Sequence, residues 1–272
     1  MPISTAARIL FVIGLASAAQ PATALDAPGR FASPPVAGKT SSARLLSDAP
    51  GPDGAYLAGV EIGLAPRTVT YWRQPGDAGE PPKFDFSGSR NVASVETLYP
   101  APKHIEEAGN LVAGYDSTVI FPLRVTAADK AQPVTLTLDL AYAACQALCL
   151  PARAHLALEL PQSGASPFAG ALSQALARAP RRLSLEETAA QIKISPRSGT
   201  LAWTLSYQGP GRLQDVFTEA PDPFFLDATR AEQGSDYILT LATNGAAAPS
   251  SVPTTLTLVT DLGALETRVE LK

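Results

Sequence analysis

Two runs of alternating apolar and polar residues flank a close pair of cysteines, which predicts a β-hairpin with sulfur at its tip. The runs are residues 135–142 and 154–160, and Cys145 and Cys149 between them are the only cysteines in 272 residues. Such alternation is typical of strands with one buried face. In a continuous strand, residues four apart lie about 13 Å from each other, whereas a disulfide needs α-carbons within roughly 7 Å. A bond between the cysteines therefore requires residues 146–148 to form a tight turn.

Three roles are open to this cysteine pair: a structural disulfide, a metal site or a redox couple. Closing so short a loop removes little entropy from the unfolded chain, so a purely structural disulfide would contribute little stability. A metal site needs further ligands, but the sole methionine is Met1 and the two histidines are His104 and His155. His155 falls on the polar side of its strand pattern and is interpreted as a surface residue. The redox couple is favoured, and the other two roles remain alternatives.

The first 24 residues have the pattern of a secretory signal peptide. Arg8 precedes an apolar stretch over residues 9–19, and residues 22–24, Ala-Thr-Ala, fit a cleavage site. The stretch is shorter than the roughly 20 residues that a membrane-spanning helix needs. We therefore expect export to an oxidising compartment in which disulfides persist, which in a bacterium is the periplasm. We expect no membrane insertion of the mature protein.

The composition indicates a globular chain and excludes two classes of partner. Hydrophobic residues make up 46% and charged residues 17%, with a formal net charge of −4 and no run of basic residues. Nucleic acid and acidic membrane surfaces are therefore not expected as partners. No cofactor is expected either.

Short strand-like runs separated by glycine and proline predict an all-β protein. One helix is predicted over residues 167–178, with Ser166 as its cap and Pro180 beyond its end. We predict a β-sandwich, a short helix and a second, smaller β-sandwich, with one continuous sandwich as the alternative. The predicted boundaries are a signal peptide over 1–24, a flexible leader over 25–50, the cysteine-bearing sandwich over 51–162, a helical linker over 163–184 and the second sandwich over 185–272.

Five further residues are candidates for capping or shielding the cysteine pair. Asp77 and Glu80 lie in a loop rich in glycine and proline that can fold over the cysteines, although a solvated turn explains them as well. Tyr71, Trp72 and Tyr142 can pack beside a disulfide, although aromatic residues in strands are commonly core residues.

Five short motifs occur in order between residues 50 and 162. They are Tyr71-Trp-Arg-Gln-Pro-Gly-Asp-Ala-Gly79, Pro81-Pro-Lys-Phe84, Tyr99-Pro-Ala-Pro102, Gly114-Tyr115 and Tyr142-x-x-Cys145-x-x-x-Cys149-x-Pro151. In this order they resemble the N-terminal periplasmic domain of the DsbD family of thiol:disulfide interchange proteins. The similarity is greatest to the branch that includes ScsB-type copper-tolerance proteins.

The resemblance implies an immunoglobulin-like sandwich with Cys145 and Cys149 as its redox pair. It also implies a membrane-embedded electron donor of the DsbD type and oxidised thioredoxin-like or client proteins of the periplasm as acceptors. By the same analogy Cys149 is the attacking cysteine. The best-known members have a longer spacer between the two cysteines, so the loop geometry here is expected to differ.

Members of that family continue into a multi-helix membrane domain and a thioredoxin-like domain, and neither follows in this sequence. We therefore expect a stand-alone soluble thiol:disulfide oxidoreductase that receives electrons from another polypeptide. The alternative function is a β-sandwich binding or scaffold module with a structural disulfide, involved in copper tolerance through Cu(I) binding by Cys145 and Cys149.

Overall fold

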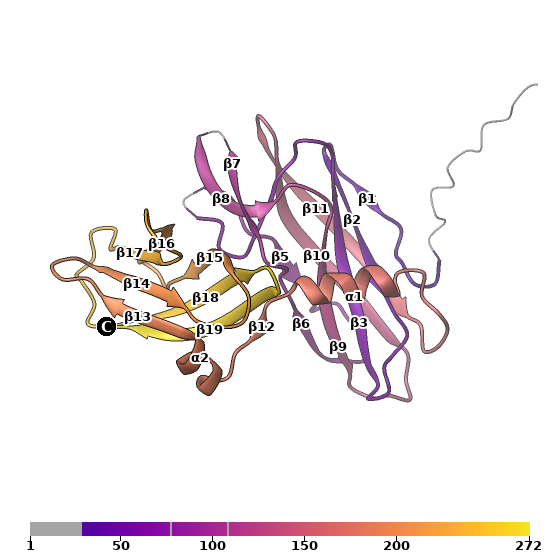
Figure 1. Cartoon of the computed structure of the whole chain (residues 1–272). Coiled ribbons are helices and arrows are strands. Elements are labelled where there is room, and N and C mark those ends of the chain that lie inside the picture. Colours follow the sequence, from indigo (N-terminus) through magenta and orange to yellow (C-terminus); the bar gives the residue numbers. More distant parts are fainter. Residues whose placement is uncertain (1–28, 77, 108) are drawn as a thin grey trace, which may run out of the picture.

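The structure is a computed structural model that describes residues 29–272 except residues 77 and 108 (Figure 1). The predicted signal peptide lies outside the described residues. The chain is mostly antiparallel β-structure, with two short helices between two β regions, which confirms the predicted fold class. Within the described part of the chain, no helix is both long and apolar enough to cross a membrane.

The first β region contains the cysteine pair and three sheets. Its strands are β1 (Val36–Ala37), β2 (Ser41–Ser47), β3 (Ala55–Leu64), β4 (Thr70–Tyr71), β5 (Lys83–Asp85), β6 (Val92–Thr97), β7 (Lys103–Glu107), β8 (Asn110–Tyr115), β9 (Val119–Ala127), β10 (Val134–Cys145) and β11 (Cys149–Leu160). The sheet orders are β1-β2-β3-β9-β6, β11-β10-β5 and β4-β8-β7. Alternate residues of β3, β9 and β10, such as Val60, Phe121 and Leu138, are fully buried in one common core. The apolar residues that alternate along these strands therefore form the main core of the region, as expected for half-buried strands.

The prediction of a flexible leader over residues 25–50 is wrong for its second half. Residues 41–47 form strand β2, which pairs along its whole length with β3, and both Leu45 and Leu46 are fully buried. The strand was missed because serine, alanine and one arginine dilute its apolar residues, while proline and glycine surround it. Pairing with a strongly apolar neighbour supplies the burial that its own composition does not indicate.

Helix α1 (Ala169–Arg178) covers the outer face of the five-stranded sheet (Figure 1). Leu172 is fully buried there against Leu46 and Ile120. Gly59 of β3 permits this approach, because a Cβ at that position would lie 2.8 Å from side-chain atoms of both Leu172 and Ile120. The helix begins two residues later than predicted, and its start carries no side-chain cap.

The second β region consists of two four-stranded sheets and a short helix that the sequence analysis did not predict. Its elements are β12 (Arg181–Arg182), α2 (Leu185–Gln191), β13 (Ile192–Pro196), β14 (Ala202–Tyr207), β15 (Leu213–Glu219), β16 (Phe225–Arg230), β17 (Tyr237–Ala242), β18 (Val252–Thr260) and β19 (Gly263–Leu271). The sheets have the orders β12-β19-β18-β15 and β13-β14-β17-β16 and enclose a separate apolar core. Ser184 and Glu187 form a capping box that begins α2.

The two β regions touch through an aromatic contact and a cluster of charges. Phe217 of β15 is 3% exposed and packs edge-on against Trp72, with ring centroids 5.7 Å apart. Arg73, the next residue, forms ion pairs with Glu219 and Glu266 of the second region. The guanidinium also lies over the rings of Trp72 and Tyr99. This contact fixes how the first region, with its disulfide, faces the second.

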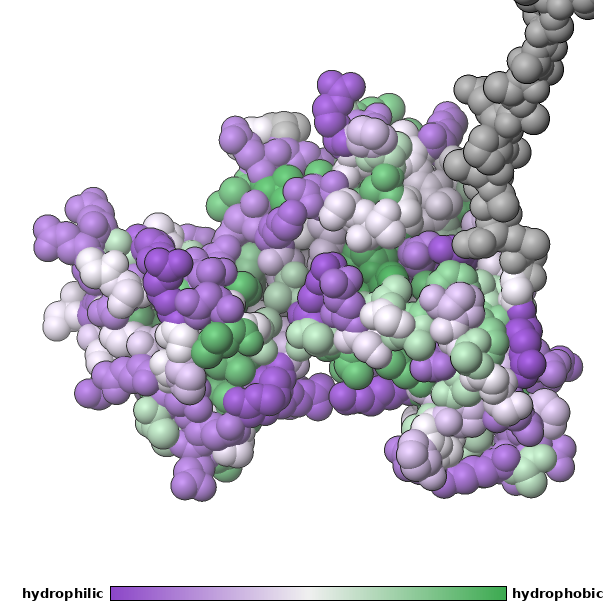
Figure 2. All heavy atoms as spheres, turned by 45° about the vertical axis from the view of Figure 1, so that its right-hand side comes forward, coloured by the Kyte–Doolittle hydropathy of each residue, from purple (hydrophilic) through white to green (hydrophobic). Residues whose placement is uncertain are grey.

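On the face shown in Figure 2, apolar residues form separate patches between polar and charged ones. The exposed large apolar side chains of the described chain are likewise dispersed along the sequence, and they are Leu111, Leu148, Leu185, Leu201 and Leu262. Two of them, Leu111 and Leu148, belong to the hairpins that surround the disulfide.

Candidate functional site

The disulfide closes the tip of the hairpin formed by β10 and β11. Cys145 ends one strand, Cys149 begins the next, and the two are the last residue pair of an unbroken antiparallel register. Their sulfurs are bonded and their α-carbons lie 3.9 Å apart. The tight turn over residues 146–148 that the spacing predicts is thereby confirmed, and it places the bond at a protruding end of the sheet.

The turn at this tip is held by the segment that precedes β4. The backbones of Val69 and Cys145 exchange two hydrogen bonds, of 2.8 and 2.9 Å. The side-chain amide of Gln146 donates to the carbonyl of Pro66 and to the hydroxyl of Thr68. The disulfide therefore sits on a fixed backbone rather than at the end of a free loop.

The two cysteines differ sharply in burial. Cys145 is fully buried in a small cluster with Val69, Tyr71 and Val112, against which Ile105 packs. Cys149 is exposed. An approaching thiolate can therefore reach the sulfur of Cys149 but not that of Cys145.

Tyr71 and Glu107 form the polar side of the disulfide. The hydroxyl oxygen of Tyr71 lies 2.7 Å from Oε2 of Glu107 and 2.9 Å from Sγ of Cys145. Glu107 Oε1 is 3.6 Å from Sγ of Cys149. The single phenolic proton is donated to the carboxylate while the cysteines are oxidised, because a charged oxygen is a far better acceptor than a disulfide sulfur.

The pKa of Tyr71 is raised well above its ordinary value of 10. Burial of the phenol is the main cause, and the hydrogen bond to Glu107 and the charge of that carboxylate add to it. A raised pKa keeps the phenol protonated throughout the neutral range. The hydroxyl therefore stays available as a hydrogen-bond donor to a thiolate that forms on Cys145.

The other predicted cap residues do not reach the disulfide. Trp72 and Tyr142 point into the main core, on the opposite side of their strands from Tyr71 and Cys145, so their prediction as shielding residues is wrong. Strand alternation explains both cases, since neighbouring residues of a strand face opposite sides. Tyr142 instead shares a 2.8 Å hydrogen bond with the hydroxyl of Ser41.

The loop rich in glycine and proline contacts the site indirectly. Gly79 has a φ of +105°, and a Cβ there would lie 2.6 Å from ring atoms of Tyr71. The loop backbone at Gly79 therefore packs directly against the ring of Tyr71, whose hydroxyl contacts Sγ of Cys145. Glu80 is exposed and pairs with Lys83 in solvent, so it does not shield the disulfide, and Asp77 lies outside the described residues.

Glu107 is the site residue that the sequence analysis missed. It lies at the tip of the β7–β8 hairpin, 42 positions before Cys149, in a segment that alternates only weakly. Its carboxylate and both sulfurs lie within 4.8 Å of one another, which is close enough for three ligands of one metal ion once the cysteines are reduced. Only the two sulfurs are soft ligands.

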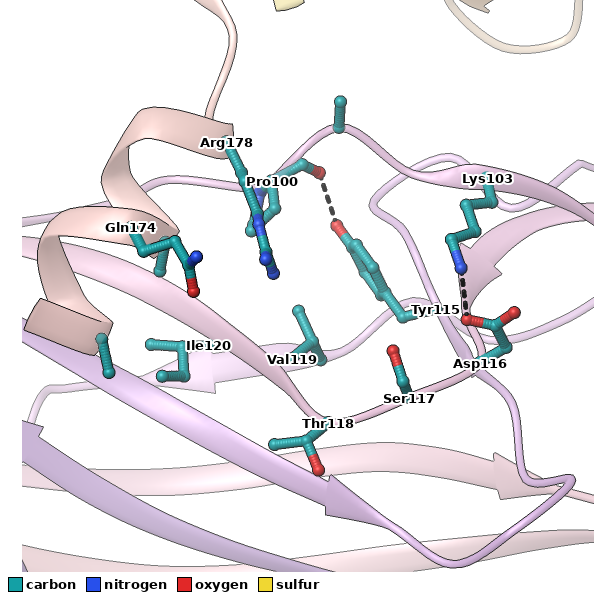
Figure 3. A pocket seen from close by; sticks show the side chains of 13 residues that line it. Pro100, Lys103, Tyr115, Asp116, Ser117, Thr118, Val119, Ile120, Gln174 and Arg178 are labelled. Carbon is teal, nitrogen blue, oxygen red and sulfur yellow. Dashed lines mark hydrogen bonds and ion pairs between the residues drawn. The ribbon is translucent and has the colours of Figure 1, made fainter. Parts of the chain in front are cut away.

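A cavity of about 460 Å³ lies between α1 and the turn that joins β8 to β9 (Figure 3). Its floor includes Val119 and Ile120, and Arg178 and Gln174 extend from the helix toward it. It reaches Lys103, at the opposite end of β7 from Glu107, and contains no cysteine. The cavity is therefore separate from the disulfide site.

Fold and site together define a class: a β-sandwich protein that carries an accessible disulfide at the tip of a hairpin. Residues 43–161 match the family model described as "Thiol:disulfide interchange protein DsbD, N-terminal", and this part of the chain belongs to that family. The similarity proposed from the sequence motifs is thereby confirmed.

A solved structure extends the similarity beyond this family segment. The crystal structure of the N-terminal periplasmic domain of ScsB from Proteus mirabilis aligns with a TM-score of 0.66 at 20% sequence identity. The alignment covers 89% of this chain and 99% of that domain, so the arrangement of two β regions is common to both. A search of curated proteins found no match.

The contact between Tyr71 and Cys145 leads to a first prediction. Tyr71→Phe removes the donor that faces the buried sulfur, and a hydrogen bond to a charged group contributes about 1.5–3 kcal/mol. We therefore expect dithiothreitol to reduce the disulfide roughly 10-fold more slowly, or slower still, as measured by stopped-flow thiol detection. Tyr142→Phe is the matched control, because it removes another buried tyrosine hydroxyl that does not touch the sulfurs. Equal rates for both variants would show that Tyr71 only packs against the site.

Proposed function

We propose that the chain is a periplasmic thiol:disulfide oxidoreductase that takes electrons from a membrane-bound donor and passes them to oxidised periplasmic proteins. The observation that carries this proposal is the unequal exposure of Cys149 and Cys145. One accessible sulfur offers a partner a single point of attack, while the buried sulfur serves as an internal resolving group. The DsbD family membership of residues 43–161 supports the same chemistry.

In the accepting half-reaction, a thiolate of the donor attacks Sγ of Cys149. The bond between Cys145 and Cys149 breaks, and Cys145 leaves as a thiolate that carries the electron pair and accepts a hydrogen bond from Tyr71. A second thiol of the donor then attacks the mixed disulfide and releases Cys149. The donor dithiol becomes a disulfide, and this chain holds two reduced cysteines.

In the donating half-reaction, the thiolate of Cys149 attacks a disulfide of the oxidised protein and forms a mixed disulfide. The thiolate of Cys145 then attacks Cys149, re-forms the internal bond and releases the reduced protein. The proximity of the two sulfurs in the hairpin makes this last step intramolecular, which favours release over accumulation of the adduct.

Partner contact at this tip is expected to be partly apolar. Leu148 is 71% exposed and directly precedes Cys149, so a protein that docks against the sulfur also buries this side chain. The predicted signal peptide over residues 1–24 supports export, and the similarity to a periplasmic domain agrees with that location.

The reduction potential of the pair tests the proposal. We expect a couple that exchanges with glutathione, with a potential above about −300 mV, since structural disulfides lie below that value. The measurement is equilibration in glutathione buffers followed by thiol labelling, and the double variant Cys145→Ser/Cys149→Ser should still fold. A potential well below about −300 mV, together with loss of folding in the double variant, would support a structural disulfide instead.

Cu(I) binding by the reduced pair is the second candidate function, because Glu107 and both sulfurs converge within 4.8 Å. The set contains two soft ligands and one hard carboxylate, which is a poorer match for Cu(I) than a third thiolate or thioether. Titration of the reduced protein with Cu(I) in the presence of a competing chelator separates the two functions.

A further inference from the structure

The β7–β8 hairpin presents one face to the disulfide and the other to the second β region (Figure 1). On the first face, Ile105 packs on the buried cluster around Cys145, and Glu107 contacts Tyr71. His104 directly precedes Ile105 in β7, and because neighbouring residues of a strand face opposite sides, its side chain points the opposite way.

His104 is held by two residues of strand β15. Its imidazole stacks on Phe217, with ring centroids 4.3 Å apart and an interplanar angle of 25°. Its Nδ1 lies 2.9 Å from Oδ2 of Asp215. Phe217 is itself fixed against Trp72 in the main core, so the stacking surface is rigid.

The rest of this face fits the second region less closely. A small cavity of about 90 Å³ separates Leu111 and Ala113 of β8 from side chains of β15 and β16, and Leu111 is 64% exposed. The His104 contact is therefore the main specific link between the hairpin and the second region among the described residues. Toward the first region, the base of the hairpin is fixed by the pairing of β8 with β4 and by Val112 in the cluster around Cys145. Loss of the His104 contact is therefore expected to loosen the free end of the hairpin, where Glu107 lies, without unfolding of either core.

We propose that the second β region is a positioning module for the redox site, acting through His104. The contact of His104 with Asp215 and Phe217 holds the β7–β8 hairpin over the disulfide and limits the access of thiolates to Cys149. This inference rests on the proposed function and assigns a task to the part of the chain that carries no cysteine. His104 is a positioning residue and takes no part in the transfer of electrons.

The effect on reactivity follows from the place of Glu107. Its carboxylate lies 3.6 Å from Sγ of Cys149 while the hairpin is closed, and a negative charge there repels an incoming thiolate. Opening of the hairpin moves this charge away and uncovers the side of Cys149 that faces Glu107. The rate of attack therefore depends on how firmly the second region holds β7.

The test compares the two histidines of the chain. His104→Ala removes the contact, whereas His155→Ala removes a similar histidine–aspartate pair, with Asp139, that is exposed on the first region and distant in sequence from β15. We expect dithiothreitol to reduce the disulfide of His104→Ala about 2- to 10-fold faster than that of the wild type. This is the size of effect expected when one hydrogen bond and the packing around it are lost. His155→Ala should match the wild type, and Asp215→Asn, which keeps an acceptor for the imidazole, should lie between.

Hydrogen exchange of the β7–β8 amides provides the second measurement and should become faster in His104→Ala only. Unchanged or slower reduction of His104→Ala, or equal acceleration in His155→Ala, would overturn the proposal. These outcomes are independent of the redox function itself, because dithiothreitol reports access to Cys149 whether or not a protein partner exists. Failure of the proposed function would appear instead as a potential typical of a structural disulfide.

Discussion

The Cys145→Ser variant is expected to accumulate a mixed disulfide through Cys149 when it is mixed with glutathione disulfide, whereas Cys149→Ser should form almost none. The reason is the difference in burial: the sulfur of Cys145 is fully covered, and that of Cys149 faces solvent. The adduct on Cys149 should also persist, because the resolving thiolate is missing from the variant. Intact-mass spectrometry after alkylation measures both variants directly.

In a full cycle of interchange, both single variants should be inactive. Removing a catalytic nucleophile lowers the rate of an enzyme on the order of 10⁴-fold or more, and each cysteine is the nucleophile of one step here. The double serine variant serves as the control for folding, checked by circular dichroism and thermal unfolding. Capture by Cys145 at the same rate as by Cys149 would contradict the assignment of the attacking sulfur.

The β10–β11 hairpin and the cysteine pair at its tip could be predicted, because the residues that indicate them lie close together in the sequence. The alternating runs on β10 and β11 are long, and a bond between cysteines four residues apart requires a sharp turn between them. Which of the two sulfurs is buried could not be predicted, because the burial of Cys145 depends on residues of β4, β7 and β8, which are distant from it in the sequence.

Glu107 of the site and strand β2 of the fold also escaped prediction, for related reasons. Nothing in the sequence distinguishes Glu107 from other surface carboxylates, and only the fold brings it close to the sulfurs. Strand β2 has a weak apolar pattern and forms because β3 offers it an edge. By contrast, Trp72 was predicted beside the disulfide together with Tyr71, yet neighbouring residues of a strand face opposite sides, and Trp72 lies in the main core.

Arg73→Ala is expected to weaken the contact between the two β regions more than any other surface substitution discussed above. Arg73 has hydrogen bonds of 2.9 and 2.7 Å with both carboxylate oxygens of Glu219 and an ion pair with Glu266. Only 26% of its side chain is exposed, and the side chain of Glu266 is 13% exposed. Truncation leaves two carboxylates close together with their shared cation removed, and we expect a loss of about 2 kcal/mol of stability, less than for a fully buried pair.

Thermal unfolding followed by near-ultraviolet circular dichroism measures this loss, since Trp72 lies in the affected contact. A destabilisation of this size corresponds to a midpoint lower by roughly 4–8 °C in a chain of this length.

Lys83→Ala provides the matched control, because it breaks an ion pair with Glu80 whose side chains are both more than half exposed, and such pairs contribute only about 0–1 kcal/mol. Arg73→Lys should recover part of the loss, because it restores the charge but not the two parallel hydrogen bonds or the stacking on Trp72. If Arg73→Ala and Lys83→Ala lower the midpoint equally, the charge cluster contributes no more than an ordinary surface pair, and the aromatic contact of Trp72 with Phe217 must hold the two regions together.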